Sequence, residues 1–121
     1  MNIFVILAIA MGLSMDAFAV AVAAGAKGGV RTMDALRIGD AAFVTAPGEP
    51  YVEIGFPVKK AAADLGFPIC FLMGVTNDGI GYIIPKEWYD KHVYEALFAI
   101  FGPTEGDYLR DQMISMVKQL K

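Results

Sequence analysis

The sequence is poor in the residues from which most catalytic and metal sites are built. Among its 121 residues there are one cysteine, Cys70, one histidine, His92, and two serines, Ser14 and Ser115. A single cysteine excludes an intramolecular disulfide framework and any zinc site made of several cysteines. One histidine excludes a multi-histidine metal centre within this sequence, and the few serines argue against a complete catalytic triad.

Charge is also scarce. Charged residues make up 19% of the sequence and hydrophobic ones 56%, with a net charge of −3. Ordinary soluble domains have about 25% and about 45–50%, respectively. The apolar excess excludes intrinsic disorder. The absence of net positive charge argues against a nucleic-acid partner. The length suits one domain with a modest core.

Much of the apolar excess lies at the N-terminus. Residues 3–26 read IFVILAIAMGLSMDAFAVAVAAGA, and Asp16 is their only charge. About 20 apolar residues are enough to cross a membrane as a helix. We therefore expect residues 1–26 to form a transmembrane helix that contacts lipid through residues 3–26. A cleaved signal peptide and a helix packed in a soluble core are the alternatives.

The basic residues near this segment predict its orientation. Lys27, Arg31 and Arg37 follow it, and no basic residue precedes it. By the positive-inside rule, the remainder of a single-span membrane protein would lie in the cytoplasm. Residues 27–39 are interpreted as a short basic connector.

The N-terminal part resembles a known family. The runs GLSMDAFAVAVAAGAK and TMDALRIG, within residues 1–39, resemble the first helix and loop of the bacterial manganese efflux pumps. In that family the matching aspartate lies on the transport path, so the resemblance implies a cation contact for Asp16. Independently, a carboxylate inside a membrane normally faces a polar cavity or a cation. A neutral Asp16 or one held by a neighbouring helix is the alternative. The family uses six spans, and nothing after residue 39 has the length and apolarity of a second one.

The rest of the chain, residues 40–121, alternates short apolar runs with helical patterns. We expect a buried strand at 41–46, a helix at 51–65, a central strand at 69–75 and extended chain at 80–84, followed by a short helical turn after Pro85. The order predicts an α/β or α+β fold, a small sheet with packed helices, preceded by the hydrophobic N-terminal helix.

Two helices carry more detailed predictions. In the first, the expected inward positions are Val52, Val58, Ala62 and Leu65, and Pro57 should kink the helix or delay its start. The last helix has an apolar stripe with steps of three and four residues, which predicts a core contact. The stripe consists of Leu109, Met113, Met116, Val117 and Leu120. Thr104 and Asp107 resemble a capping pair at its start.

Two loops carry candidate functional residues. Glu49 follows the strand at 41–46 within Pro47-Gly48-Glu49-Pro50, and ligands often bind at the carboxyl ends of strands. A solvated loop carboxylate or a helix N-terminal acid is the alternative. The glycine-rich stretch from Asn77 to Gly81 is a candidate binding loop, and an ordinary tight turn is its alternative.

These segments together resemble neutral ceramidases. The runs IGDAAFVTAPGEPYVEIG, MGVTNDGIGYI and YEALFAIFGPTEGDYL, within residues 36–120, resemble the C-terminal end of that catalytic domain. Neutral ceramidases are zinc amidases that split ceramide into sphingosine and fatty acid. The resemblance implies that Glu49 of the PGE motif and Tyr82 of the N-x-x-x-x-Y motif are zinc ligands.

The resemblance also implies an incomplete site. In the family, two histidine ligands and the catalytic serine come from earlier parts of the chain, and this sequence has no counterpart to them. Two ligands leave half of a four-coordinate zinc shell empty. We therefore expect Glu49 and Tyr82 to be relics or a half-site, without tight zinc binding by this chain alone, unless a partner chain completes the site.

Three functional hypotheses follow. The first is a ceramidase-like fragment behind a hydrophobic helix, inactive by itself. The second is a remnant of a manganese-efflux-like membrane protein. The third is a single-span protein whose second part binds another chain without chemistry. The sequence leaves open whether the two halves are a natural fusion, a truncation or an artificial join.

Overall fold

The computed structural model describes residues 33–121, which belong to a compact unit beginning at Thr32. The predicted membrane segment at 3–26 and Asp16 lie outside the described residues. No helix within residues 33–121 has the length and apolarity to cross a membrane. The elements along the chain are β1 (Ala35–Ile38), β2 (Ala41–Thr45), β3 (Glu49–Pro50), α2 (Val52–Asp64), β4 (Ile69–Met73), β5 (Tyr82–Ile83), α3 (Lys86–Asp90), the 3₁₀ helix η1 (Tyr94–Phe98) and α4 (Glu105–Lys118).

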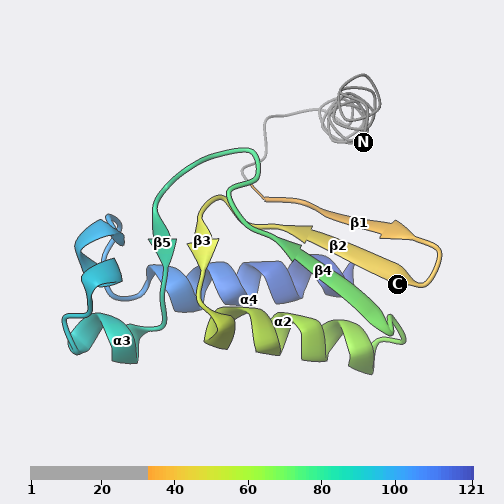
Figure 1. The fold of residues 1–121 in the computed structure, drawn as a ribbon. Coiled ribbons are helices and arrows are strands. Elements are labelled where there is room, and N and C mark those ends of the chain that lie inside the picture. Colours follow the sequence, from red (N-terminus) through yellow and green to blue (C-terminus); the bar gives the residue numbers. More distant parts are fainter. Residues whose placement is uncertain (1–32) are drawn as a thin grey trace, which may run out of the picture. The chain divides into compact units, whose positions relative to one another are not determined.

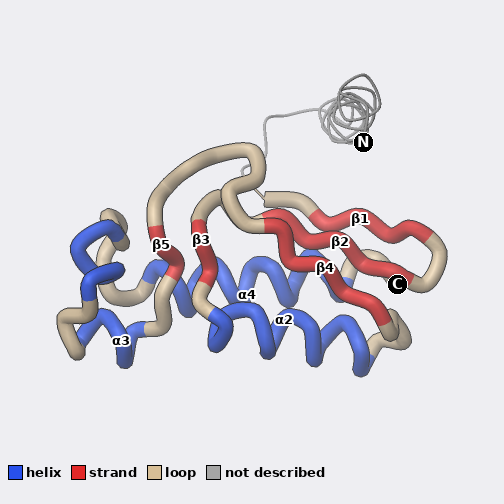
Figure 2. Tube along the Cα trace, viewed as in Figure 1, coloured by secondary structure: helices blue, strands red, loops and turns tan. Residues whose placement is uncertain are grey.

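Two small sheets organise this unit (Figure 1). The larger sheet has the order β1-β2-β4, with β1 antiparallel and β4 parallel to the central β2. The smaller sheet pairs β3 with β5 in parallel. The predicted α/β fold class is thus confirmed, with parallel strands joined through a helix, as Figure 2 shows.

The core lies on one face of the larger sheet. Alternate residues of a strand point to opposite faces, and in β2 the buried alternate positions are Ala42 and Val44. They join a cluster with Ile54 and Val58 of α2 and Met113 of α4. The two long helices therefore cover the same face of the sheet, where they also pack against each other.

Two strands differ from the expectation. β1 was not predicted; it lies within the stretch interpreted as a connector and forms a hairpin with β2. The expected central strand at 69–75 is β4, which lies at an edge of the sheet among the described residues, while β2 takes the central place. The apolar composition of β4 had indicated burial on all sides, but Ile69 and Phe71 are each 50% exposed.

The predicted helix at 51–65 corresponds closely to α2. Val58 and Ala62 are buried as expected, and Ile54 belongs to the same face because it lies four residues before Val58. The inward assignment of Val52 is wrong, since this residue is 57% exposed. Pro57 does not delay the helix, which begins at Val52 and continues past the proline to Asp64.

The final helix is also confirmed, but not its cap. Met113 and Val117 are buried, and the other members of the predicted apolar stripe pack against the core. The predicted pairing of Thr104 with Asp107 does not form. Thr104 has helical backbone angles and no side-chain capping bond. The Asp107 carboxylate instead accepts hydrogen bonds from Lys86 and Arg110.

Gly106 provides a test of how α4 packs. A Cβ atom at this position would collide with the carbonyl oxygen of Ile84, which follows β5. Helix propensity alone predicts that Gly106→Ala stabilises the protein by up to about 1 kcal/mol. We expect the opposite, a loss of about 1–3 kcal/mol in the free energy of unfolding, because the added methyl group would overpack the contact with the Ile84 carbonyl.

The measurement is the free energy of unfolding in urea. Gly79→Ala is the matched control, because a Cβ there meets no atom within 4 Å. It should change stability by no more than about 0.5 kcal/mol. A Gly106→Ala protein as stable as the wild type would contradict the described packing of α4.

Candidate functional site

Glu49 and Tyr82 lie side by side in the smaller sheet. They are direct register partners in the parallel pair β3–β5. The Glu49 amide donates to the Gly81 carbonyl at 2.8 Å, and the Tyr51 amide donates to the Ile83 carbonyl at 2.9 Å. Register partners on adjacent strands place their side chains on the same face of a sheet. The structure therefore brings together two residues that are 33 positions apart in the sequence.

Two glycines allow this close pairing. A Cβ at Gly48 would collide with the Gly81 carbonyl oxygen, and a Cβ at Gly81 would collide with the carbonyl oxygen of Phe98. Gly81 also has a φ of +93°, a conformation that other residues rarely adopt. Gly81 thus has a structural role beside the site. The predicted binding function of Asn77 and Gly81 stays a prediction.

Aromatic side chains stand beside Tyr82. Its ring makes edge contacts with Tyr94 and Phe98 of η1, at centroid distances of 6.3 and 6.4 Å. Tyr94 and Phe98 contact each other at 5.2 Å. Both are substantially exposed, Tyr94 to 63% and Phe98 to 46%. Tyr94 and Glu95 begin one of the three sequence runs that resemble neutral ceramidases, but the sequence alone predicts no role for them.

Nearby carboxylates and burial raise the pKa values of two tyrosines at the site. The nearby Glu49 carboxylate is the main cause that raises the pKa of Tyr82, with a smaller effect of burial. Burial, followed by the adjacent Glu95 carboxylate, raises the pKa of Tyr51 to about 12. At neutral pH both phenols are therefore neutral hydrogen-bond donors. Tyr51 was not singled out in the sequence, because its place after Glu49-Pro50 reads as an ordinary helix start.

Candidate metal ligands are few among the described residues. Within residues 33–121, no group of three or more His, Cys, Asp or Glu side chains is arranged to hold a metal ion. Glu49 and Tyr82 supply two oxygen donors. The thiol of Cys70 faces the helices, where burial raises its pKa, as expected for a small apolar side chain in a strand.

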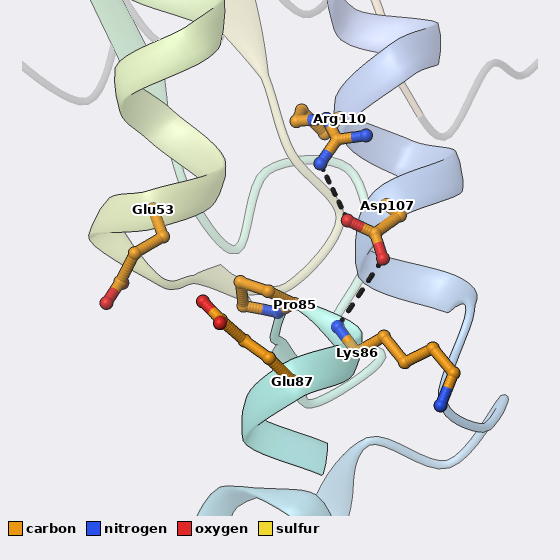
Figure 3. A pocket seen from close by; sticks show the side chains of 6 residues that line it. All are labelled: Glu53, Pro85, Lys86, Glu87, Asp107 and Arg110. Carbon is orange, nitrogen blue, oxygen red and sulfur yellow. Dashed lines mark hydrogen bonds and ion pairs between the residues drawn. The ribbon is translucent and has the colours of Figure 1, made fainter. Parts of the chain in front are cut away.

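A separate concave region lies away from the Glu49–Tyr82 pair. It has a volume of about 290 Å³, and Figure 3 shows that its lining comes from α2, the start of α3 and α4. The lining residues are Glu53, Pro85, Lys86, Glu87, Asp107 and Arg110. This pocket was not predicted from the sequence, because its residues come from three separate elements.

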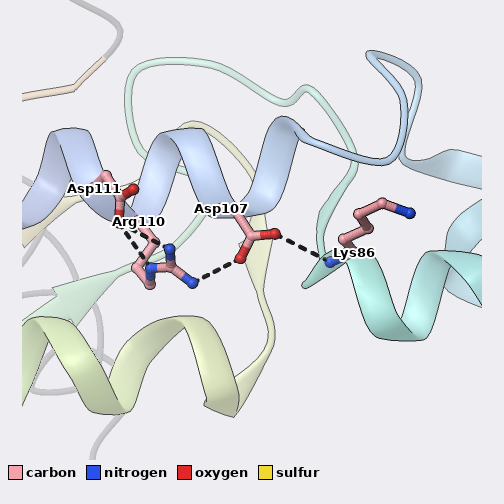
Figure 4. A network of polar contacts seen from close by, with 4 residues as sticks. All are labelled: Lys86, Asp107, Arg110 and Asp111. Atoms are coloured by element: carbon pink, nitrogen blue, oxygen red, sulfur yellow. Dashed lines mark hydrogen bonds and ion pairs between the residues drawn. The ribbon is translucent and has the colours of Figure 1, made fainter.

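Three of the five charged side chains that line this pocket have ion-pair partners, since Asp107 pairs with Arg110 and Lys86 pairs with Asp90. Asp107 contacts the Arg110 guanidinium at 2.6 Å and accepts from the Lys86 amide at 3.4 Å, while Arg110 also pairs with Asp111 at 2.9 Å (Figure 4). These contacts link the start of α3 to α4. The pocket is thus best explained as a polar contact between helices that supports the fold.

Comparison with known proteins finds solved structures with a similar fold. No known family profile matches the sequence, and no curated protein matches it. Two solved structures do match the fold: a ceramidase complexed with C2, and the neutral ceramidase from Pseudomonas aeruginosa. Each has a TM-score of 0.64 and 24% sequence identity, over 71% of this chain.

The match concerns a small part of those proteins. The chain aligns with 14% of the length of each ceramidase. At this level of identity the comparison establishes the fold of the matched part. The fold resemblance to neutral ceramidase is thus supported, whereas the resemblance of residues 1–39 to manganese efflux pumps stays a prediction.

The coupling between Glu49 and Tyr82 gives a direct test of their adjacency. Glu49→Gln removes the negative charge that chiefly raises the pKa of Tyr82, so this pKa should fall toward its ordinary value of about 10. The measurement is the ultraviolet absorbance of the phenolate during alkaline titration. The control is Glu49→Gln in a Tyr82→Phe protein, where the substitution should not shift the titration curve of the remaining tyrosines comparably. An equal change in both backgrounds would show that Glu49 acts on another tyrosine.

Proposed function

We propose that the described unit is one part of a zinc amidohydrolase catalytic domain of the neutral ceramidase type. The observation that supports this proposal most is the pairing of Glu49 with Tyr82 on adjacent parallel strands, within a fold that matches part of a ceramidase. The reaction of that family, hydrolysis of the N-acyl bond of ceramide, is the proposed activity of the completed domain.

Glu49 and Tyr82 would hold the zinc ion from one side. A carboxylate and a phenol are both oxygen donors, and together they fill two positions of a four-coordinate shell. When bound, zinc in such enzymes polarises a carbonyl group and lowers the pKa of a bound water. The other ligands and the nucleophile must come from outside the described unit, because His92 is the only histidine in this sequence.

The protonation of Tyr82 opposes zinc binding by these two residues alone. A phenol becomes a strong ligand only after it loses its proton, so metal binding there releases a proton. The Glu49 carboxylate raises the pKa of Tyr82 and makes this loss harder in the absence of metal. Zinc already held by other ligands would reverse this effect through its own positive charge. We therefore propose that the half-site is filled only in the completed domain.

The N-terminal segment belongs to the same proposal. Ceramide is a membrane lipid, and a lipid contact through residues 3–26 would hold the unit near its substrate. The transport hypothesis depends on Asp16, which lies outside the described residues, and the described unit contributes no observation in its favour.

Zinc titration of the 121-residue chain tests the half-site. We expect binding weaker than micromolar at pH 7, because only two donors are available and one must lose a proton. Affinity should increase with pH as that proton becomes easier to remove. The measurement is isothermal titration calorimetry, with Glu87→Gln as a control for an acid in the separate pocket. Submicromolar one-to-one binding that Glu49→Gln abolishes would reveal a complete site and contradict the proposal.

Turnover tests the assignment of activity. The chain alone should not hydrolyse a fluorescent ceramide. Co-expression with the Pseudomonas aeruginosa ceramidase chain from which the matched part has been deleted should restore hydrolysis. In that complex, Glu49→Gln should lower kcat by about 100-fold or more, because a metal ligand is lost, and Glu87→Gln should leave it nearly unchanged. Restored turnover that does not depend on Glu49 would contradict its role.

A further inference from the structure

The larger sheet has a second face that the described helices do not cover. Its core face carries Ala42 and Val44 of β2, so the intervening residue Phe43 points to the opposite, outer face. Register places Leu36 and Phe71 on either side of Phe43 across the three strands. The next row across the sheet is Ile38, Ala41 and Ile69. We call these six side chains the outer sheet face.

This face is apolar and accessible in the described unit. Phe43 and Phe71 stack at a centroid distance of 5.0 Å. Phe71 and Ile69 are each 50% exposed, and Ile38 is 56% exposed. None of the six residues is polar or charged. Contiguous apolar surfaces of this kind are rare on monomeric soluble proteins and usually mark an interaction site.

The strands themselves have the composition of strands covered on both faces. β2 reads AAFVT and β4 reads ICFLM, without the polar alternation of a strand that has one solvated face. The two strands are parallel, and parallel strands are nearly always covered on both faces. The helices α2 and α4 supply one cover. The pattern therefore indicates a second protein layer on the outer sheet face.

We propose that the outer sheet face is the surface on which the remainder of a ceramidase-like catalytic domain docks. The matching ceramidase structures support this occupant, because this fold accounts for only 14% of their chain. The register pairing of Glu49 with Tyr82 agrees with this occupant, because a zinc ion held there, as proposed above, would need further ligands from outside the unit. The inference rests on the proposed function and names the surface through which the completing polypeptide binds.

The position of the face suits this role. β2 leads through Pro47 and Gly48 directly into β3, where Glu49 lies. Backbone contacts continue from β4 to the same point, since the Val75 amide donates to the Gly48 carbonyl at 2.9 Å. A polypeptide seated on β2 and β4 is therefore adjacent to the strand ends that lead to the half-site. A polypeptide that covers this face and extends past the C-terminal ends of β2 and β4 would reach β3, where Glu49 lies.

The test uses the full 121-residue chain, tagged and co-expressed with the Pseudomonas aeruginosa ceramidase chain lacking its matched part. We expect a one-to-one complex by size-exclusion chromatography. Phe43→Lys and Phe71→Lys should each weaken it at least tenfold, because a charge would be buried at the interface. Val52→Lys is the matched control: Val52 is 57% exposed on α2, in the layer that covers the other face, and its substitution should leave binding unchanged.

Melting of the isolated variants shows whether each chain is still folded. Phe71→Lys and Val52→Lys should melt within a few degrees of the wild type, because both side chains are at least half exposed. Phe43→Lys should melt somewhat lower, because it removes the stacking of a half-buried ring on Phe71. Failure of the wild-type chain to form the complex, or a complex insensitive to Phe43→Lys and Phe71→Lys, would overturn the inference. So would a homodimer that these two substitutions dissociate, since the face would then join two copies. A complex that depends on the face but lacks ceramide turnover would support the docking surface and count against the proposed function.

Discussion

The close approach of two glycine backbones, at Gly48 and Gly81, is the constraint on which the candidate site depends. Neither position has space for a Cβ atom, and the Gly81 carbonyl accepts the hydrogen bond from the Glu49 amide. This contact pairs β3 with β5 and so places Glu49 beside Tyr82. The smaller sheet has only two residues in each strand, so its register rests on these few backbone bonds. The chemistry of the site is thus a consequence of backbone geometry.

The sequence predicted the elements better than their places in the fold. Helical spacing identified α2 and α4, because Val58, Ala62, Met113 and Val117 repeat with the period of a helix. An apolar run identified β4 but not its edge position, since the run shows that a strand is covered without showing by what. β1 escaped prediction because Arg37 and its neighbours look like a basic connector. Only the structure shows that these residues pair with β2.

The same distinction holds for the site. The place of Glu49 after a predicted strand made it a candidate, whereas Tyr82 was identified only through a family resemblance. The adjacency of the two residues depends on a strand register that no local pattern encodes. The neighbouring Tyr51 and Glu95 are far apart in the sequence, and the effect of the Glu95 carboxylate on the pKa of Tyr51 appears only once the chain is folded. The pairing of Asp107 with Arg110 shows the reverse case. A local pattern with Thr104 suggested a cap, but the carboxylate instead pairs with Arg110 one turn along the same helix and accepts a hydrogen bond from the Lys86 amide at the start of α3.

The proposed half-site and the proposed docking surface both imply that the described unit works together with further polypeptide. A unit of this size has enough core to hold α2 and α4 on one face of its sheet, and it leaves apolar side chains on the other. The most direct measurement of the central claim is anomalous X-ray diffraction at the zinc edge, from crystals of the complex with the truncated Pseudomonas aeruginosa ceramidase. The account predicts a zinc peak in contact with both the Glu49 carboxylate and the Tyr82 phenol. A peak at other residues, such as those of the Asp107 pocket, would contradict it.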